Sequence, residues 1–82
     1  MVVSAYTFIR IESSKLEELV DKLKKLRFVK EVTAVYGEYD VIVKTETDSL
    51  EELDFFIYNE LRKLPALATT TTMIKANLAA TS

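Results

Sequence analysis

The chain has no histidine, cysteine or tryptophan, and only one glycine and one proline among its 82 residues. Without cysteine there can be no disulfide framework, thiol nucleophile or cysteine-based metal site. Without histidine, imidazole-bearing zinc sites, histidine-ligated haem and histidine-based catalytic triads are excluded. A single glycine rules out both the GxGxxG dinucleotide motif and the P-loop. We therefore expect no cofactor and no enzymatic activity.

Charge and hydropathy exclude further classes. No apolar run approaches the roughly 20 residues that a membrane-spanning helix needs, and no targeting segment is recognisable. Eleven Lys and Arg residues against 13 Asp and Glu residues give a net charge of −2, so the chain has no basic field for nucleic acid. With 49% hydrophobic residues, we expect one folded cytoplasmic domain over residues 1–82. A single core of this size leaves little stability margin, which favours oligomerisation.

A strand and a helix are predicted in the first third of the chain. Residues 2–11 are rich in β-branched and aromatic side chains, which favour a strand. Ser14 to Glu17 has the form of a capping box, in which a hydroxyl and a carboxylate satisfy free backbone amides at a helix start. Apolar residues then recur at helical spacing up to Leu26.

A hairpin is predicted next. Residues 29–36 and 39–46 favour strands, and only Gly37 and Glu38 separate them, which is typical of a two-residue turn. A chain that uses glycine once is expected to place it where the backbone needs positive φ or where another group approaches closely. The alternative is an ordinary hairpin turn. Asp40, just behind the turn, either satisfies backbone amides or offers acceptors to a ligand's ammonium group.

The last third predicts a second helix and a final strand. Asp48 to Glu51 is a second capping signal. An apolar stripe follows at helical spacing, formed by Leu50, Leu53, Ile57, Leu61 and Leu64. Pro65 ends the helix, and residues 67–78 favour a strand that contains four consecutive threonines. The threonine run reflects β propensity, or else hydroxyls that face a ligand or partner.

The predicted order β-α-β-β-α-β indicates a ferredoxin-like α+β fold, with a four-stranded antiparallel sheet and both helices on one face. The first strand is apolar on both sides, so the opposite sheet face needs a cover as well. A second copy is the economical cover, giving a dimeric α/β barrel. The predicted dimer interface comprises Val3, Ala5, Tyr6 and Phe8.

Residues 35–44, V-Y-G-E-Y-D-V-I-V-K, closely resemble the V-T-G-x-Y-D-hydrophobic motif of the C-terminal RAM domain of the Lrp/AsnC family. Residues 64–67 and 70–74 are similar to two further elements of that domain. Tyr36 and Ala66 depart from the usual threonine and glycine. The resemblance covers nearly the whole chain but not the family's helix-turn-helix, so we expect a stand-alone RAM domain.

The resemblance implies a transcription-regulatory domain that binds a small effector, usually an amino acid, between dimers. It also implies sheet-to-sheet dimers, rings of four or five dimers, and a full-length Lrp/AsnC-type regulator as a partner. On this basis Gly37 allows close approach and Asp40 receives the α-ammonium, with Tyr39, Thr70 and Thr72 as further contacts. Two alternatives are a purely structural assembly domain without an effector and a small enzyme or haem-handling protein of the dimeric α+β barrel type.

Overall fold

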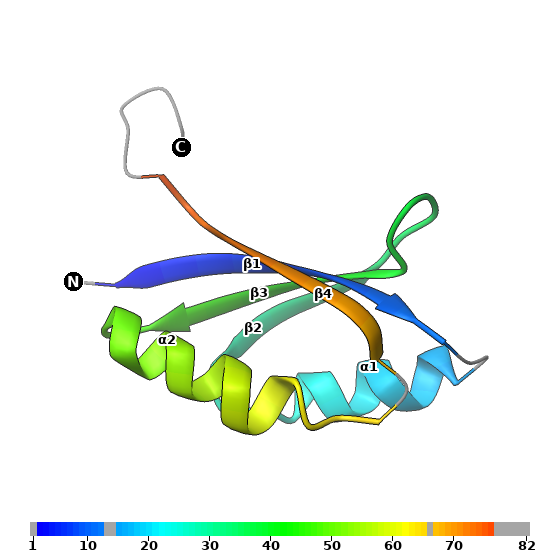
Figure 1. Cartoon of the computed structure of the whole chain (residues 1–82), viewed down its shortest axis with the longest axis horizontal. Coiled ribbons are helices and arrows are strands. Elements are labelled where there is room, and N and C mark those ends of the chain that lie inside the picture. Colours follow the sequence, from blue (N-terminus) through cyan, green and yellow to red (C-terminus); the bar gives the residue numbers. More distant parts are fainter. Residues whose placement is uncertain (1, 13–14, 66, 77–82) are drawn as a thin grey trace.

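The computed structural model describes residues 2–12, 15–65 and 67–76. Strands and helices follow one another in the predicted order (Figure 1). Their bounds are β1 Val3–Ile11, α1 Leu16–Lys24, β2 Val29–Ala34, β3 Val41–Thr47, α2 Leu50–Phe56 and β4 Leu67–Ile74, with a π-helical turn η1, Ile57–Leu61, continuing α2. The predicted last strand is shorter than expected: residues 75 and 76 are not in a strand, and residues 77 and 78 lie outside the described residues.

The four strands form one antiparallel sheet in the order β2-β3-β1-β4. The central strand β1 pairs with both β3 and β4, so that Ile9 lies opposite Val41 on one side and Thr70 on the other. Both helices cover the same face of this sheet (Figure 1). The predicted ferredoxin-like fold is confirmed. Within one chain the sheet is open, with β2 and β4 as its edges.

The core lies between the sheet and the helices. Alternation along β1 turns Ala5, Thr7 and Ile9 towards the helices, and all three are buried. The main cluster of buried side chains consists of Ile9, Leu19, Leu23, Val41, Val43, Phe56 and Leu61. Burial of this apolar surface, at about 25 cal/mol per Å², holds α1 and α2 against one face and leaves the other sheet face open.

The helix starts differ in detail from the sequence prediction. The N-cap position of α1 is Lys15, and the expected cap Ser14 lies outside the described residues. In α2 the cap is Ser49, whose Oγ accepts a hydrogen bond from the Glu52 N–H at 3.1 Å. Glu52 Oε1 in turn accepts from the Asp48 N–H at 2.8 Å. The predicted capping signal, residues 48–51, contains the true cap Ser49, whereas the carboxylate that completes the pairing is Glu52, one residue beyond that segment.

The second helix widens into a π-turn at its end. The Arg62 N–H donates to the Ile57 carbonyl, five residues back, at 3.0 Å. Phe56 and Leu61, also five residues apart, are both fully buried, whereas Leu50 is 54% exposed. The predicted apolar stripe included the exposed Leu50 and missed the buried Phe56, although Phe56 follows Leu53 at ordinary helical spacing.

The hairpin between β2 and β3 is confirmed, but its two-residue turn is not. Residues 35–40 connect the strands, closed by a 2.9 Å hydrogen bond from the Val35 N–H to the Asp40 carbonyl. Gly37 has φ +132°, so the expected positive φ is confirmed. Arg10 holds the connection by donating from Nε and Nη2 to the Glu38 carbonyl, at 3.0 and 2.7 Å. Because Arg10 of β1 binds the connection, the six residues 35–40 form a loop and not the predicted two-residue turn.

Candidate functional site

Asp40 ties the hairpin to the central strand. Its backbone N–H donates to the Ile9 carbonyl at 2.8 Å, and its Oδ2 accepts from the Ile11 N–H at 2.9 Å. One carboxylate oxygen of Asp40 therefore already accepts a hydrogen bond from a backbone amide. This is the first of the two predicted roles of Asp40, satisfying backbone amides or binding an ammonium group. The side chain is only partly buried, so a ligand can still approach it.

The two other predicted hairpin residues differ in their surroundings. The Tyr39 ring packs edge-to-face against Phe8, with ring centroids 5.4 Å apart, which orients it to the open face of the sheet. Gly37 is exposed, and a Cβ added there would have no atom within 4 Å. Its conformation, and not crowding by the chain itself, is therefore what requires glycine.

The predicted threonines lie on the helix-covered face of β4. Thr70 and Thr72 are partly buried, and Thr72 Oγ1 shares a 3.0 Å hydrogen bond with Thr7 Oγ1. Because β3 and β4 flank β1 on opposite sides, one copy of the chain separates Thr70 from Asp40 by a strand. The five predicted effector residues therefore form two groups: a hairpin group (Gly37, Tyr39, Asp40) and a threonine pair (Thr70, Thr72).

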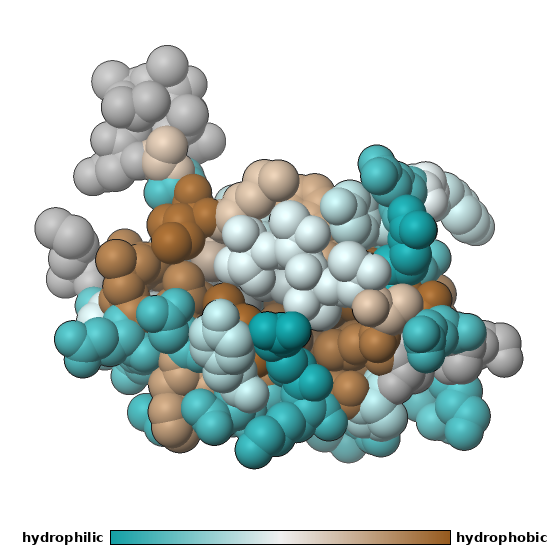
Figure 2. All heavy atoms as spheres, viewed as in Figure 1, coloured by the Kyte–Doolittle hydropathy of each residue, from teal (hydrophilic) through white to brown (hydrophobic). Residues whose placement is uncertain are grey.

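An open groove runs between β4 and the helical segment α2–η1. It consists of two adjoining cavities of about 300 and 330 Å³, which share Arg62 and Thr70. The polar side chains of the larger cavity include Asp54, Arg62 and both predicted threonines, and its aliphatic ones are Leu53, Ile57 and Ile74. Figure 2 shows this side of the molecule, where weakly polar side chains over β4 adjoin strongly hydrophilic ones, with hydrophobic patches to either side.

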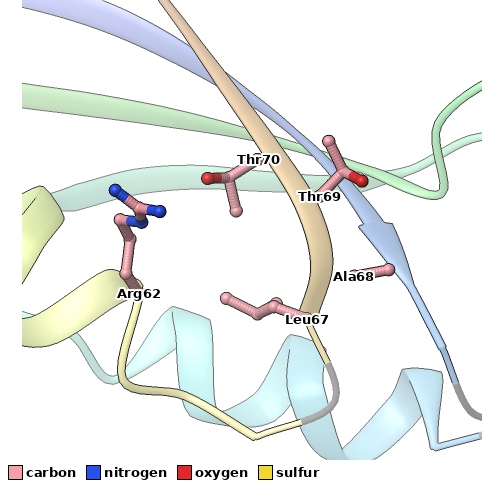
Figure 3. Close-up of a pocket in the computed structure, with 5 residues that line it drawn as sticks. All are labelled: Arg62, Leu67, Ala68, Thr69 and Thr70. Atoms are coloured by element: carbon pink, nitrogen blue, oxygen red, sulfur yellow. The ribbon is translucent and has the colours of Figure 1, made fainter.

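A β-bulge shapes the end of the groove. Thr69 pairs with Arg10 and Leu67 with Ile11, so that Ala68 is an extra residue in β4. The bulge allows Leu67 and Thr70, three residues apart, to point to the same side. In Figure 3 both extend into the cavity towards Arg62, while Ala68 and Thr69 point away from it.

Arg62 is the residue that sequence reasoning missed. Its guanidinium carbon lies 5.4 Å from the centroid of the Tyr58 ring. Within residues 2–12, 15–65 and 67–76 the one ion pair joins Lys44 and Glu46 at 3.9 Å, so Arg62 has no acidic partner there. The available signal was the spacing of Asp54, Tyr58 and Arg62, four residues apart in turn, which indicates one helix face.

The open face of the sheet carries aromatic and aliphatic groups. Tyr6 and Phe8 of β1 lie there, paired with Met73 and Thr71 of β4. Of the four predicted interface residues, Ala5 is on the wrong side: it is fully buried beneath the helices, because successive strand residues alternate between faces. Val3 lies two residues before Ala5 and therefore on the same face of the sheet as Ala5. Of the four predicted interface residues, only Tyr6 and Phe8 lie on the open face.

Neither a membrane span nor a metal centre is found in the part of the chain that the structure describes. None of its helices is long and apolar enough to cross a bilayer. No three of its aspartate and glutamate side chains gather into a group that could hold a metal ion.

The fold and the V-Y-G-E-Y-D hairpin agree with a comparison against known families. The Lrp/AsnC ligand binding domain matches residues 4–77. The chain belongs to the Lrp/AsnC family. A curated relative, the HTH-type transcriptional regulator FL11 of Pyrococcus abyssi, is 33% identical over 70 residues, which are 85% of this chain and 46% of that protein. The chain thus spans about half the length of the curated Lrp/AsnC relatives it matches.

Solved structures of similar fold include one matched over nearly its whole length and one matched over about half of it. The crystal structure of FFRP-DM1 is 44% identical, with a TM-score of 0.86, and the match covers 90% of this chain and 99% of that one. The transcriptional regulator NMB0573 from Neisseria meningitidis, solved in complex with L-Met, is 16% identical with a TM-score of 0.82, covering 90% of this chain and 49% of that one. The second likeness shows the fold alone. The curated relatives of this chain are named as transcriptional regulators and not as enzymes.

Proposed function

We propose that this chain is a cytoplasmic, oligomerising domain of the Lrp/AsnC family that binds an amino acid and thereby modulates transcription without binding DNA itself. The groove beside Thr70 and Thr72 carries the proposal. Its larger cavity, about 330 Å³, holds both threonines, a guanidinium and a carboxylate next to aliphatic side chains. A cavity of this size, in which several polar groups converge beside aliphatic side chains, is suited to a small polar ligand.

The charge of the chain supports a role through protein partners. A net charge of −2 gives little electrostatic affinity for the phosphate backbone. The open sheet face, with Tyr6 and Phe8, offers apolar surface for a second copy or for a full-length regulator of the family. Rings of four or five dimers would follow from further contacts between such dimers.

Effector binding and assembly are linked in this proposal. One copy holds the hairpin group and the threonine pair on opposite sides of β1, and in the proposed assembly the hairpin group of one copy approaches the threonine pair of another. A ligand that binds only the assembled form stabilises it by mass action. The L-Met complex of NMB0573 supports amino acids as the ligand class for this fold.

The hydrogen bond from Ile11 to Asp40 favours a second candidate function, a structural assembly domain without an effector. In that case the carboxylate predicted to receive an ammonium group serves only the backbone. The two functions differ in whether any small molecule changes the assembly.

The test measures native mass by light scattering, and melting temperature, with each of the standard amino acids. We expect one or a few amino acids to raise the melting temperature or change the mass, and Thr70→Val to weaken that response. Thr71→Val is the matched control, because Thr71 pairs with Phe8 on the other face of the same strand. A fixed mass and an unchanged melting temperature with every amino acid would favour the structural function.

A further inference from the structure

An ion pair lies on the open face of the sheet, the face that the helices leave uncovered (Figure 1). Every second side chain of β3, from Val41 to Thr47, is buried against the helices, so Lys44 and Glu46 project to the opposite face. Lys44 Nζ and Glu46 Oε2 are 3.9 Å apart. We infer, resting on the assembly in the proposed function, that these two charges select which chain covers the open face. The partner they fit is a second copy of this chain.

The ion pair is surrounded by apolar groups on the inner strands of the sheet. Lys44 is paired across the strands with Tyr6 of β1, and Tyr6 is paired on its other side with Met73 of β4. The side chains of Lys44 and Glu46 are each 34% exposed, so their neighbours already shield most of their surface. Any chain that covers the apolar part of this face therefore removes the remaining water from both charges.

One chain does not satisfy the ion pair by itself. The separation of 3.9 Å is longer than a hydrogen bond, and an exposed pair of this kind contributes little to the stability of a single chain. An ammonium group has three donors and a carboxylate has two acceptor oxygens. Within the described part of the chain these two side chains make no hydrogen bond. Two charges left in this state inside a dry interface oppose association.

A second copy supplies the missing partners. In an interface with two-fold symmetry, a contact from Lys44 of one copy to Glu46 of the other is repeated in the reverse direction. Four charges of alternating sign then meet, with no net charge. Their attraction is stronger away from water than it is on the surface of one chain.

A cover without these charges is rejected. It would bury an ammonium group and a carboxylate without partners, which costs free energy in addition to the attraction that is lost. The apolar side chains around Tyr6 give affinity for apolar surfaces in general, and the ion pair adds selectivity. A full-length regulator of the family is thus a partner only if its own sheet face presents opposite charges to Lys44 and Glu46.

The experiment exchanges the charges. Lys44→Glu and Glu46→Lys are studied alone and mixed in equal amounts, with one variant isotope-labelled, by native mass spectrometry. Each variant alone opposes like charges, so its association should be weaker than that of the wild type by about 100-fold or more. The mixture should restore association, almost entirely as mixed pairs. The double variant Lys44→Glu/Glu46→Lys carries the same charges in exchanged places and should associate with itself.

Lys22→Glu and Glu51→Lys are the matched controls. They change the net charge by the same amounts, but at exposed positions on α1 and α2, which cover the other sheet face. Association of each control should equal that of the wild type. A loss as large as that of Lys44→Glu would indicate a general effect of charge and overturn the inference. If a single variant of the ion pair does not fold, the double variant decides, and its failure to associate has the same meaning.

The selectivity is tested with Lys44→Met/Glu46→Met. This variant should associate with itself, because apolar side chains replace the charges, but it should form fewer mixed pairs with the wild type than random pairing gives. Random pairing would overturn the inference. So would single variants that associate like the wild type, or that stay apart when mixed, and the proposed function would stand in both cases. A monomeric wild type would overturn the inference and the proposed assembly together.

Discussion

The carboxylate of Asp40 accepts a hydrogen bond from the backbone N–H of Ile11 at 2.9 Å and so links the hairpin to the end of β1. Together with the bonds from Arg10 to the Glu38 carbonyl, it fixes the connection between β2 and β3 against the central strand. The residue predicted to receive the ligand's ammonium group therefore has a structural role. Any substitution there has to be judged on both properties.

Asp40→Ala is expected to lower the free energy of unfolding by about 1–3 kcal/mol, because it leaves the partly buried Ile11 N–H without its acceptor. Asp40→Asn retains an acceptor oxygen and should cost less. Urea denaturation measures both, with Glu38→Ala as a control, since Glu38 contacts Arg10 only through its backbone carbonyl. A stable Asp40→Asn that loses about 2 kcal/mol of effector binding would place the carboxylate in the site; unchanged affinity would remove it.

Thr45→Val is expected to raise the free energy of unfolding by about 1 kcal/mol. The Thr45 side chain is 1% exposed, and its Oγ1 has no hydrogen-bond partner in the described part of the chain, so valine removes an unsatisfied polar group at similar volume. Thr7→Val is the matched comparison. Thr7 is equally buried but bonds Thr72 Oγ1, so this variant should be destabilised. Thermal unfolding measures the stability of both variants against the wild type. If Thr45→Val is destabilised, the Thr45 hydroxyl has a hydrogen-bond partner such as a buried water.

Phe8→Glu is expected to give monomers or insoluble protein, because an unpaired charge would be buried in the interface across the open sheet face. Phe55→Glu is the control: Phe55 is 62% exposed on α2, away from that face. Light scattering after gel filtration measures the mass of each. If Phe8→Glu remains a soluble dimer like Phe55→Glu, the two copies do not associate through their sheets.

Features set by neighbouring residues were predictable from the sequence. The order of strands and helices follows from the change of apolar period between residues 2–11 and the first helix. The positive φ of Gly37 follows from the use of a single glycine. A cap near Ser49 follows from its hydroxyl, although its true partner is Glu52. Each of these depends on contacts within a few residues.

Features set by packing across the molecule were not predictable in the same way. The connection 35–40 is wider than its turn residues suggest because Arg10 and Ile11 of β1 bind it. The extra residue at Ala68 is visible only in the register of β4 against β1. Arg62 was passed over because it lies outside the hairpin motif, and only the folded helix brings it opposite Thr70.

The π-turn Ile57–Leu61 takes up one residue more than a turn of α-helix. Phe56 and Leu61, five residues apart across it, both face the core. Deleting one residue there would place Leu61 four residues after Phe56, which is the spacing of one face of a regular α-helix, so Leu61 would stay in the core. The π-turn is thus a position at which related chains could differ in length by one residue while keeping the same core.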